Sequence, residues 1–223
     1  MSPVNSVPAA RSLTRERELL VTYGRRLGPD GLAIGTSGNL SCRSGELVAI
    51  TPRGFRYDVL APEHICVVTL EGRPVHAPLG PSSELPMHLA VYKRSDAGAV
   101  VHTHSPHATT LGTLVDELPP IHYLIALLGG PVRVAPYATP GSPELADHMA
   151  RAMEDRSAVL LGNHGALAVG DTLEAAYSRA VLLEWLSALY YRARLVGEPR
   201  LLDLDEIARV GEQMKHYLQD PAD

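Results

Sequence analysis

The chain has 223 residues, enough for one substantial domain with a sizeable buried core. Its composition is 45% hydrophobic and 20% charged, as in a globular protein, and its net charge of −5 with no basic block argues against nucleic-acid binding. Two cysteines without CxxC spacing argue against a disulfide framework or a thiolate zinc site, and they favour a reducing cytoplasm.

Residues 1–11 form a Pro-, Ser- and Ala-rich segment that we expect to be disordered. This segment lacks the continuous apolar run of a secretory signal. The most apolar helical stretch, AVLLEWLSALYY, contains Glu184 and is too short to span a bilayer. We therefore expect a cytoplasmic protein that binds neither membrane nor nucleic acid, with residues 1–223 forming a single domain.

Apolar residues at helical or alternating spacing indicate the order of the elements along the chain. Helices are expected at residues 13–27, 81–95, 108–115, 142–155, 171–197 and 205–218. Strands are expected as a hairpin within residues 31–54, singly at 65–70, 99–104 and 132–138, and as a second pair within 157–170. Hairpins combined with helix-separated strands predict a mixed or largely antiparallel sheet covered by helices, in one α/β domain.

Two of these helices carry explicit boundary signals. Ser142 is expected to cap the helix that Pro143 begins. The longest helix is expected to open at Asp171, with Glu174 three residues further on, and to stop near Gly197.

His102 and His104 end an apolar, β-branched strand. Residues i and i+2 of a strand project from the same face, so the two imidazoles could share a metal ion. His164 lies in a Gly-flanked turn between two apolar strands, a rigid place for a third ligand that would leave one coordination position open. Spacing alone cannot pair His164 with the other two, so ordinary strand-end histidines remain an alternative at this point.

Glu84 follows two serines at a predicted helix start. It could be a first-turn carboxylate that complements the helix dipole, or a general base whose pKa a nearby metal tunes. The loops GTSGN (35–39), TPRG (51–54) and PSS (81–83) offer small residues and backbone amides, which suit either ordinary turns or anion binding. Three such loops beside a candidate metal pair favour a phosphorylated ligand.

Seven motifs occur in series between about residues 13 and 218: GTSGNLS, TPRG, PSSE, AVVHTHSPH, IHYLIALLGG, APYATPGSPELADH and LLGNHGAL. Together they resemble the class II (zinc-dependent) aldolase/adducin-head family, and their order is most similar to its L-fuculose-1-phosphate aldolase branch. The resemblance implies a three-layer α/β/α fold around a central, largely antiparallel mixed sheet. It also implies a cyclic homotetramer with active sites between subunits.

The same resemblance implies one zinc ion per subunit, held by His102, His104 and His164, with Glu84 beside it as a resting ligand or as the catalytic acid/base. A substrate phosphate would be held by amides and hydroxyls of Thr36, Gly38, Asn39, Arg53, Gly54, Ser82 and Ser83.

Two tyrosines also match family positions. Tyr123 matches a tyrosine that reaches the neighbouring subunit's site and protonates the aldehyde oxygen. Tyr217 matches a second tyrosine on a mobile tail, so residues 205–223 are expected to lie near an active site.

The implied reaction is reversible cleavage of a ketose 1-phosphate, L-fuculose 1-phosphate or a 5-deoxypentulose analogue, to dihydroxyacetone phosphate and a small aldehyde. Zinc would act as a Lewis acid that stabilises the enediolate. A carboxylate would move a proton at C3, and a phenol would protonate the aldehyde oxygen. Alternatives are an L-ribulose-5-phosphate 4-epimerase-like enzyme, a methylthioribulose-phosphate dehydratase, and a non-catalytic adducin-like binding module. Such a module would be expected to lose the zinc ligands or the base, and this chain keeps both.

One residue departs from the family pattern. The second loop reads TPRG where TPSG or TPTG is usual, so Arg53 replaces a small hydroxyl residue. Its side chain could strengthen the phosphate grip, turn to solvent or signal a different substrate. We expect its backbone amide to bind the phosphate.

Overall fold

The computed structural model describes residues 13–219, with side chains up to residue 214, so the segment 1–11 that was expected to be disordered lies outside the described residues. The helices are α1 (Thr14–Arg26), α2 (Leu85–Arg94), α3 (Pro106–Leu111), α4 (Pro143–Ala152), α5 (Leu173–Val196) and α6 (Leu204–Gln219), with 3₁₀ turns η2 (Tyr57–Val59), η3 (Pro62–His64) and η4 (Tyr123–Leu128). The strands are β1 (Asn39–Ser44), β2 (Leu47–Ile50), β3 (Cys66–Thr69), β4 (Pro74–His76), β5 (Ala99–Thr103), β6 (Glu117–Leu118), β7 (Val132–Ala135), β8 (Ala158–Leu161) and β9 (Gly165–Gly170).

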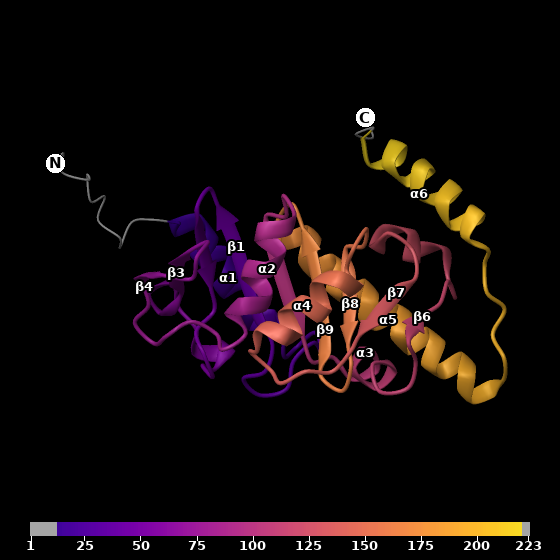
Figure 1. The fold of residues 1–223 in the computed structure, drawn as a ribbon, viewed down its shortest axis with the longest axis horizontal. Coiled ribbons are helices and arrows are strands. Elements are labelled where there is room, and N and C mark those ends of the chain that lie inside the picture. Colours follow the sequence, from indigo (N-terminus) through magenta and orange to yellow (C-terminus); the bar gives the residue numbers. More distant parts are fainter. Residues whose placement is uncertain (1–12, 220–223) are drawn as a thin grey trace.

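The strands of residues 13–219 form one sheet in the order β4-β3-β2-β1-β5-β9-β8-β7-β6. Within this part of the chain β7 and β8 pair in parallel, and the other neighbours pair antiparallel. The sequence-based prediction of a largely antiparallel mixed sheet is confirmed. Its centre, where β1, β5 and β9 lie side by side, carries the histidine-bearing segments described below (Figure 1).

Helices cover both faces of the sheet because its central strands are apolar on both sides. In β5, Val101 packs into a core with α1, α3 and α5, whereas its neighbour Val100 packs into a second core with α2 and α4. Leu186 of α5 and Met87 of α2 are fully buried in these two cores. The predicted three-layer α/β/α arrangement is confirmed, with α2 and α4 overlying the sheet in Figure 1.

The predicted start of α4 is confirmed and that of α5 is wrong by one residue. Ser142 caps α4, its side chain accepting the N–H of Leu145 at 3.1 Å. At α5 the capping side chain belongs to Thr172, which accepts the N–H of Ala175, and not to Asp171. Strand β9 continues to Gly170, so Asp171 still belongs to the turn that leaves the strand.

Short elements account for the remaining differences from the predicted order. Helix α3 begins at Pro106, before the expected position 108, and ends at Leu111, because Ser105 and Pro106 already form a helix start and Gly112 ends the helix. The two- and three-residue strands β6 and β4 have no apolar period long enough to detect. No helix within residues 13–219 combines the length and apolar character needed to cross a bilayer.

Candidate metal and phosphate site

His102 and His104 project from the face of the sheet that α2 covers. His102 lies in β5 opposite Asn39 of β1 and Leu167 of β9, and it is fully buried, while His104 follows the strand and is partly exposed. The Nδ1 atom of His102 lies 2.9 Å from the carbonyl oxygen of Ala166. A carbonyl only accepts, so Nδ1 donates to it and Nε2 is the ring nitrogen that faces the cluster.

His164 enters the same space from the turn between β8 and β9, confirming that the chain brings this distant histidine to the pair. Its ring centroid lies 5.0 Å from those of His102 and His104. The following residue, Gly165, allows this approach: a Cβ there would lie 2.3 Å from the carbonyl oxygen of Thr103. The turn therefore packs against the end of β5 only because it carries glycine.

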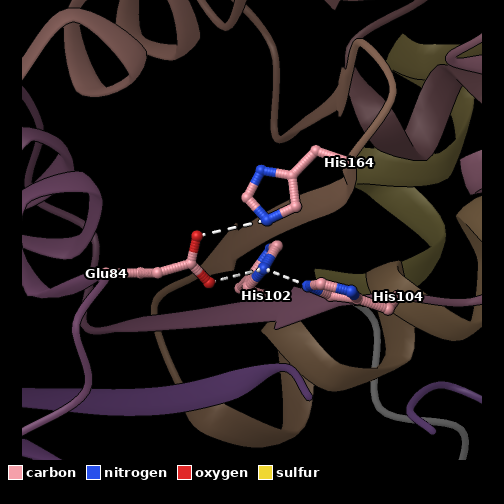
Figure 2. Close-up of side chains that lie close together, drawn as sticks. All are labelled: Glu84, His102, His104 and His164. Atoms are coloured by element: carbon pink, nitrogen blue, oxygen red, sulfur yellow. Dashed lines mark hydrogen bonds and ion pairs between the residues drawn. The ribbon is translucent and has the colours of Figure 1, made fainter. Parts of the chain in front are cut away.

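Glu84 completes the cluster from the N-terminus of α2. It occupies the N-cap position but makes no side-chain capping hydrogen bond, so its carboxylate does not serve the helix start. Instead, Oε2 lies 2.9 Å from Nε2 of His102 and Oε1 lies 3.2 Å from Nε2 of His164 (Figure 2). Burial raises the pKa of Glu84, but the two imidazoles lower it more, so the net pKa lies well below its ordinary value.

These four side chains fit a metal ion. Their ligand atoms all lie within 4.8 Å of one another. Nε2 of His102 faces the Glu84 carboxylate and also lies 2.9 Å from Nε2 of His104, so several electron-rich atoms point at one another in a buried space. Burial lowers the pKa of His104 to about 4, which keeps that ring neutral near pH 7. A cation could be held among these atoms, because imidazoles and carboxylates are common transition-metal ligands.

The three small-residue loops meet at this cluster. They line a cavity of about 140 Å³ together with Glu84 and His104; the loop residues that line it are Thr36, Ser37, Gly38, Asn39, Pro52, Arg53, Gly54, Ser82 and Ser83. Gly38 approaches β5 closely, since a Cβ there would lie 2.8 Å from the carbonyl oxygen of His102, and its φ of +75° also favours glycine. The cavity thus joins candidate anion-binding loops to the candidate metal ligands.

In two loop residues, a group that was expected to bind phosphate makes a hydrogen bond within the protein. The N–H of Arg53, which was expected to bind phosphate, donates to the carbonyl of Gly80 at 3.2 Å in this structure. The bond belongs to a short bridge that pins Pro52 beside Pro81. The side-chain amide of Asn39 instead donates to Oε2 of Glu84 at 3.1 Å.

Behind Asn39 lies a buried polar chain that sequence reasoning missed. His88 Nε2 lies 2.5 Å from Oδ1 of Asn39, and Ser41 Oγ lies 2.6 Å from both His88 Nδ1 and the Tyr92 hydroxyl. The signal was available: residues 84, 88 and 92 recur every four positions on α2, and residues 39 and 41 share one face of β1.

Three other residues of interest are not among the described residues that line the cavity. Tyr123 begins η4, is 46% exposed and does not line the cavity of this protomer. The backbone of Tyr217 belongs to α6, and its side chain lies outside the described residues. His107 lies in the first turn of α3, with its N–H and Nδ1 both close to Oε1 of Glu184.

The chain is similar to class II aldolases over most of its length. The family model described as Class II Aldolase and Adducin N-terminal domain matches residues 18–191. A 5-deoxy-D-ribulose 1-phosphate aldolase of Bacillus thuringiensis serovar kurstaki is 43% identical over 210 residues, covering 93% of this chain and 99% of that protein. An L-fuculose phosphate aldolase of Escherichia coli is 42% identical over 190 residues, covering 84% and 88%.

The fold is shared with a solved L-fuculose 1-phosphate aldolase. That structure superposes with a TM-score of 0.89 at 39% identity, covering 92% of this chain and 99% of the other. The family match and the relatives agree with the series of motifs in the sequence. The chain therefore belongs to the class II aldolase and adducin N-terminal domain family.

Proposed function

We propose that this protein is a zinc-dependent aldolase that reversibly cleaves a ketose 1-phosphate to dihydroxyacetone phosphate and a small aldehyde. A lyase of the class II aldolase type follows from the family and from the names of its relatives. The observation that carries the proposal is the single cavity in which three anion-binding loops meet Glu84 and His104. The named relatives act on 5-deoxy-D-ribulose 1-phosphate or L-fuculose phosphate, and we propose a substrate of this class.

Zinc would be held by His102, His104 and His164, with Glu84 beside it. Bound there, it would supply Lewis-acid stabilisation of negative charge on the substrate oxygens. Glu84 would move the proton at C3, since its carboxylate is buried, ionised and adjacent to the cavity. A non-catalytic binding module would have no need of this set of side chains.

The loops would hold the phosphate away from the bond that breaks, which orients the substrate. Gly38, Gly54, Ser82 and Ser83 would contribute amides or hydroxyls, with Thr36 beside them. Because the Arg53 amide is already bonded to Gly80, Arg53 would act through its exposed guanidinium.

The proposal includes a homotetramer whose sites lie between subunits, in the cytoplasm. Tyr123 would protonate the aldehyde oxygen in a neighbouring subunit's site, because it is exposed and does not line the cavity of its own protomer. Helix α6 packs on η4, the turn that begins with Tyr123, so Tyr217 would come from the same end of the molecule. Both cysteines are free and buried, which suits a reducing compartment.

The test is a panel of ketose 1-phosphates assayed for release of dihydroxyacetone phosphate, with zinc measured on the same preparation. We expect zinc near one per chain and turnover of at least one member. A Glu84→Gln variant should keep its zinc and lose at least about 100-fold in turnover, because it lacks the group that moves the proton. Absence of zinc or of dihydroxyacetone phosphate would refute the proposal, and inversion of a pentulose phosphate without cleavage would assign an epimerase instead.

A further inference from the structure

The buried chain behind Glu84 connects five side chains that come from two elements. It runs from Glu84 to Asn39, His88, Ser41 and Tyr92 through contacts of 3.1, 2.5, 2.6 and 2.6 Å. All five side chains are buried. Glu84, His88 and Tyr92 come from α2 and its N-cap, while Asn39 and Ser41 come from β1.

The direction of every hydrogen bond in this series of five side chains follows from the Glu84 carboxylate and from the state of the His88 ring. The Asn39 amide nitrogen donates to the Glu84 carboxylate, so the amide oxygen faces His88 and must accept from its Nε2–H. Complete burial lowers the pKa of His88 to about 3, so the ring is neutral near pH 7 and Nδ1 must accept.

Ser41 therefore donates its hydroxyl proton to Nδ1 of His88 and accepts from the Tyr92 hydroxyl. Every donor in the chain points toward Glu84. A proton on Oε2 of Glu84 that points toward Asn39 would require Asn39 to flip and His88 to change tautomer. The chain therefore keeps Oε2 as an acceptor.

The other carboxylate oxygen has no such partner. Oε1 is buried and accepts no hydrogen bond within the described residues, although Nε2 of His164 lies 3.2 Å away. The chain also ends at the hydroxyl of Tyr92, which is 2% exposed, so it does not lead to solvent and cannot carry protons out of the site.

We propose that Asn39, His88, Ser41 and Tyr92 are positioning residues that fix the orientation of the Glu84 carboxylate, through the hydrogen bond that Asn39 donates to its Oε2. This inference rests on the proposed role of Glu84 as the acid/base. His88 is the centre of the chain, because its tautomer sets the direction of the bonds on both sides.

The activity test compares His88→Met with His88→Gln, two side chains of similar size of which the second keeps a donor toward Asn39. We expect His88→Met to lower kcat about tenfold, the cost of one hydrogen bond to a charged group, while KM stays within about threefold and metal content is unchanged. His88→Gln should recover most of the lost kcat. Wild-type kcat in His88→Met, or equal losses in both variants, would overturn the proposal.

A measurement on the wild-type protein keeps the inference testable if the variants do not fold or if no substrate is turned over. Nitrogen-15 NMR of histidine-labelled protein should show His88 as the neutral Nε2–H tautomer, unchanged from about pH 6 to about pH 9. Its signal is assigned by through-space contacts of the ring protons with Ser41 and Asn39. An Nδ1–H tautomer, or titration of His88 in this range, would refute the proposed series of hydrogen bonds, whether or not the protein is an aldolase.

Discussion

Gly165 shows how one residue fixes the geometry of the site. It connects His164 to β9, and a Cβ at this position would lie 2.3 Å from the carbonyl oxygen of Thr103 and 3.4 Å from the rings of His102 and His104. The nearest atom, the carbonyl oxygen of Thr103, belongs to the backbone, so no side-chain rotation can make room for the added methyl group. Any larger residue must displace the turn that carries His164.

We therefore expect Gly165→Ala to lose most of its bound metal and to unfold with a free energy lower by about 2 kcal/mol. Metal content by mass spectrometry and urea denaturation would measure the two effects. Gly28→Ala is the matched control, because a Cβ at Gly28 meets nothing within 4 Å. Normal metal content in Gly165→Ala would show that the turn is not held by this contact.

For single residues, the sequence identified the side chains that cluster as candidate metal ligands better than the side chains that support them. The period of a strand places His102 and His104 on one face, and the family resemblance supplies His164 and Glu84. The partner of Asn39 depends on the pairing of β1 with β5, which sets Asn39 opposite His102, and no local pattern specifies that register. Its role beside Glu84 therefore became visible only in three dimensions.

Among the elements, α3 is held in place by a carboxylate from α5. Glu184 Oε1 accepts the N–H of His107 at 3.0 Å and lies 2.7 Å from its Nδ1, while Oε2 accepts the N–H of Ala108 at 2.8 Å. These are unpaired donors at a helix start, and a carboxylate also complements the helix dipole there. Glu184, whose charge was evidence against a membrane span in the sequence, thus holds α3 against α5.

Glu184→Ala should lower the free energy of unfolding by about 2 kcal/mol, because it leaves the two N–H groups without a partner. Urea denaturation would measure the loss. Glu174→Ala is the control on the same helix, since Glu174 is exposed, and it should change stability by less than about 0.5 kcal/mol. Equal effects in the two variants would contradict the docking role.

Long elements were predictable because their signals are local and repeated. The helices α1, α4 and α5 have apolar periods of several turns, and the cap at Ser142 was identified correctly. The cap of α5 was misplaced because Asp171 and Thr172 are both good capping residues, and the end of β9 decides between them. That decision depends on strand pairing, which a local window does not contain.

For the whole molecule, α5 and η4 carry an exposed apolar surface that could bind a second copy in the proposed homotetramer. Trp185 and Val181 lie one turn apart on α5 and are 46% and 42% exposed, and Tyr123 of η4 is 46% exposed. The ring of His122 packs against both Tyr123 and Trp185. Burial of this surface between subunits would remove apolar area from water and bring Tyr123 to another subunit's site.

If each active site of the proposed homotetramer is built from two subunits, two different inactive variants should restore activity when they assemble together. Glu84→Gln and Tyr123→Phe should each lose most activity, but a refolded equal mixture of the two should regain about one quarter of wild-type activity. The reason is combinatorial: a site works when one subunit supplies an intact Glu84 and its neighbour an intact Tyr123, which random assembly gives at about one site in four.

The measurement is the rate of ketose phosphate cleavage before and after the two variants are unfolded together and reassembled. Each variant refolded alone is the control, and it should stay at its own low rate. If Tyr123 acted within its own protomer, every subunit in the mixture would still carry one lesion in its own site. The mixture would then show only the average of the two variants, and the placement of active sites between subunits would be wrong.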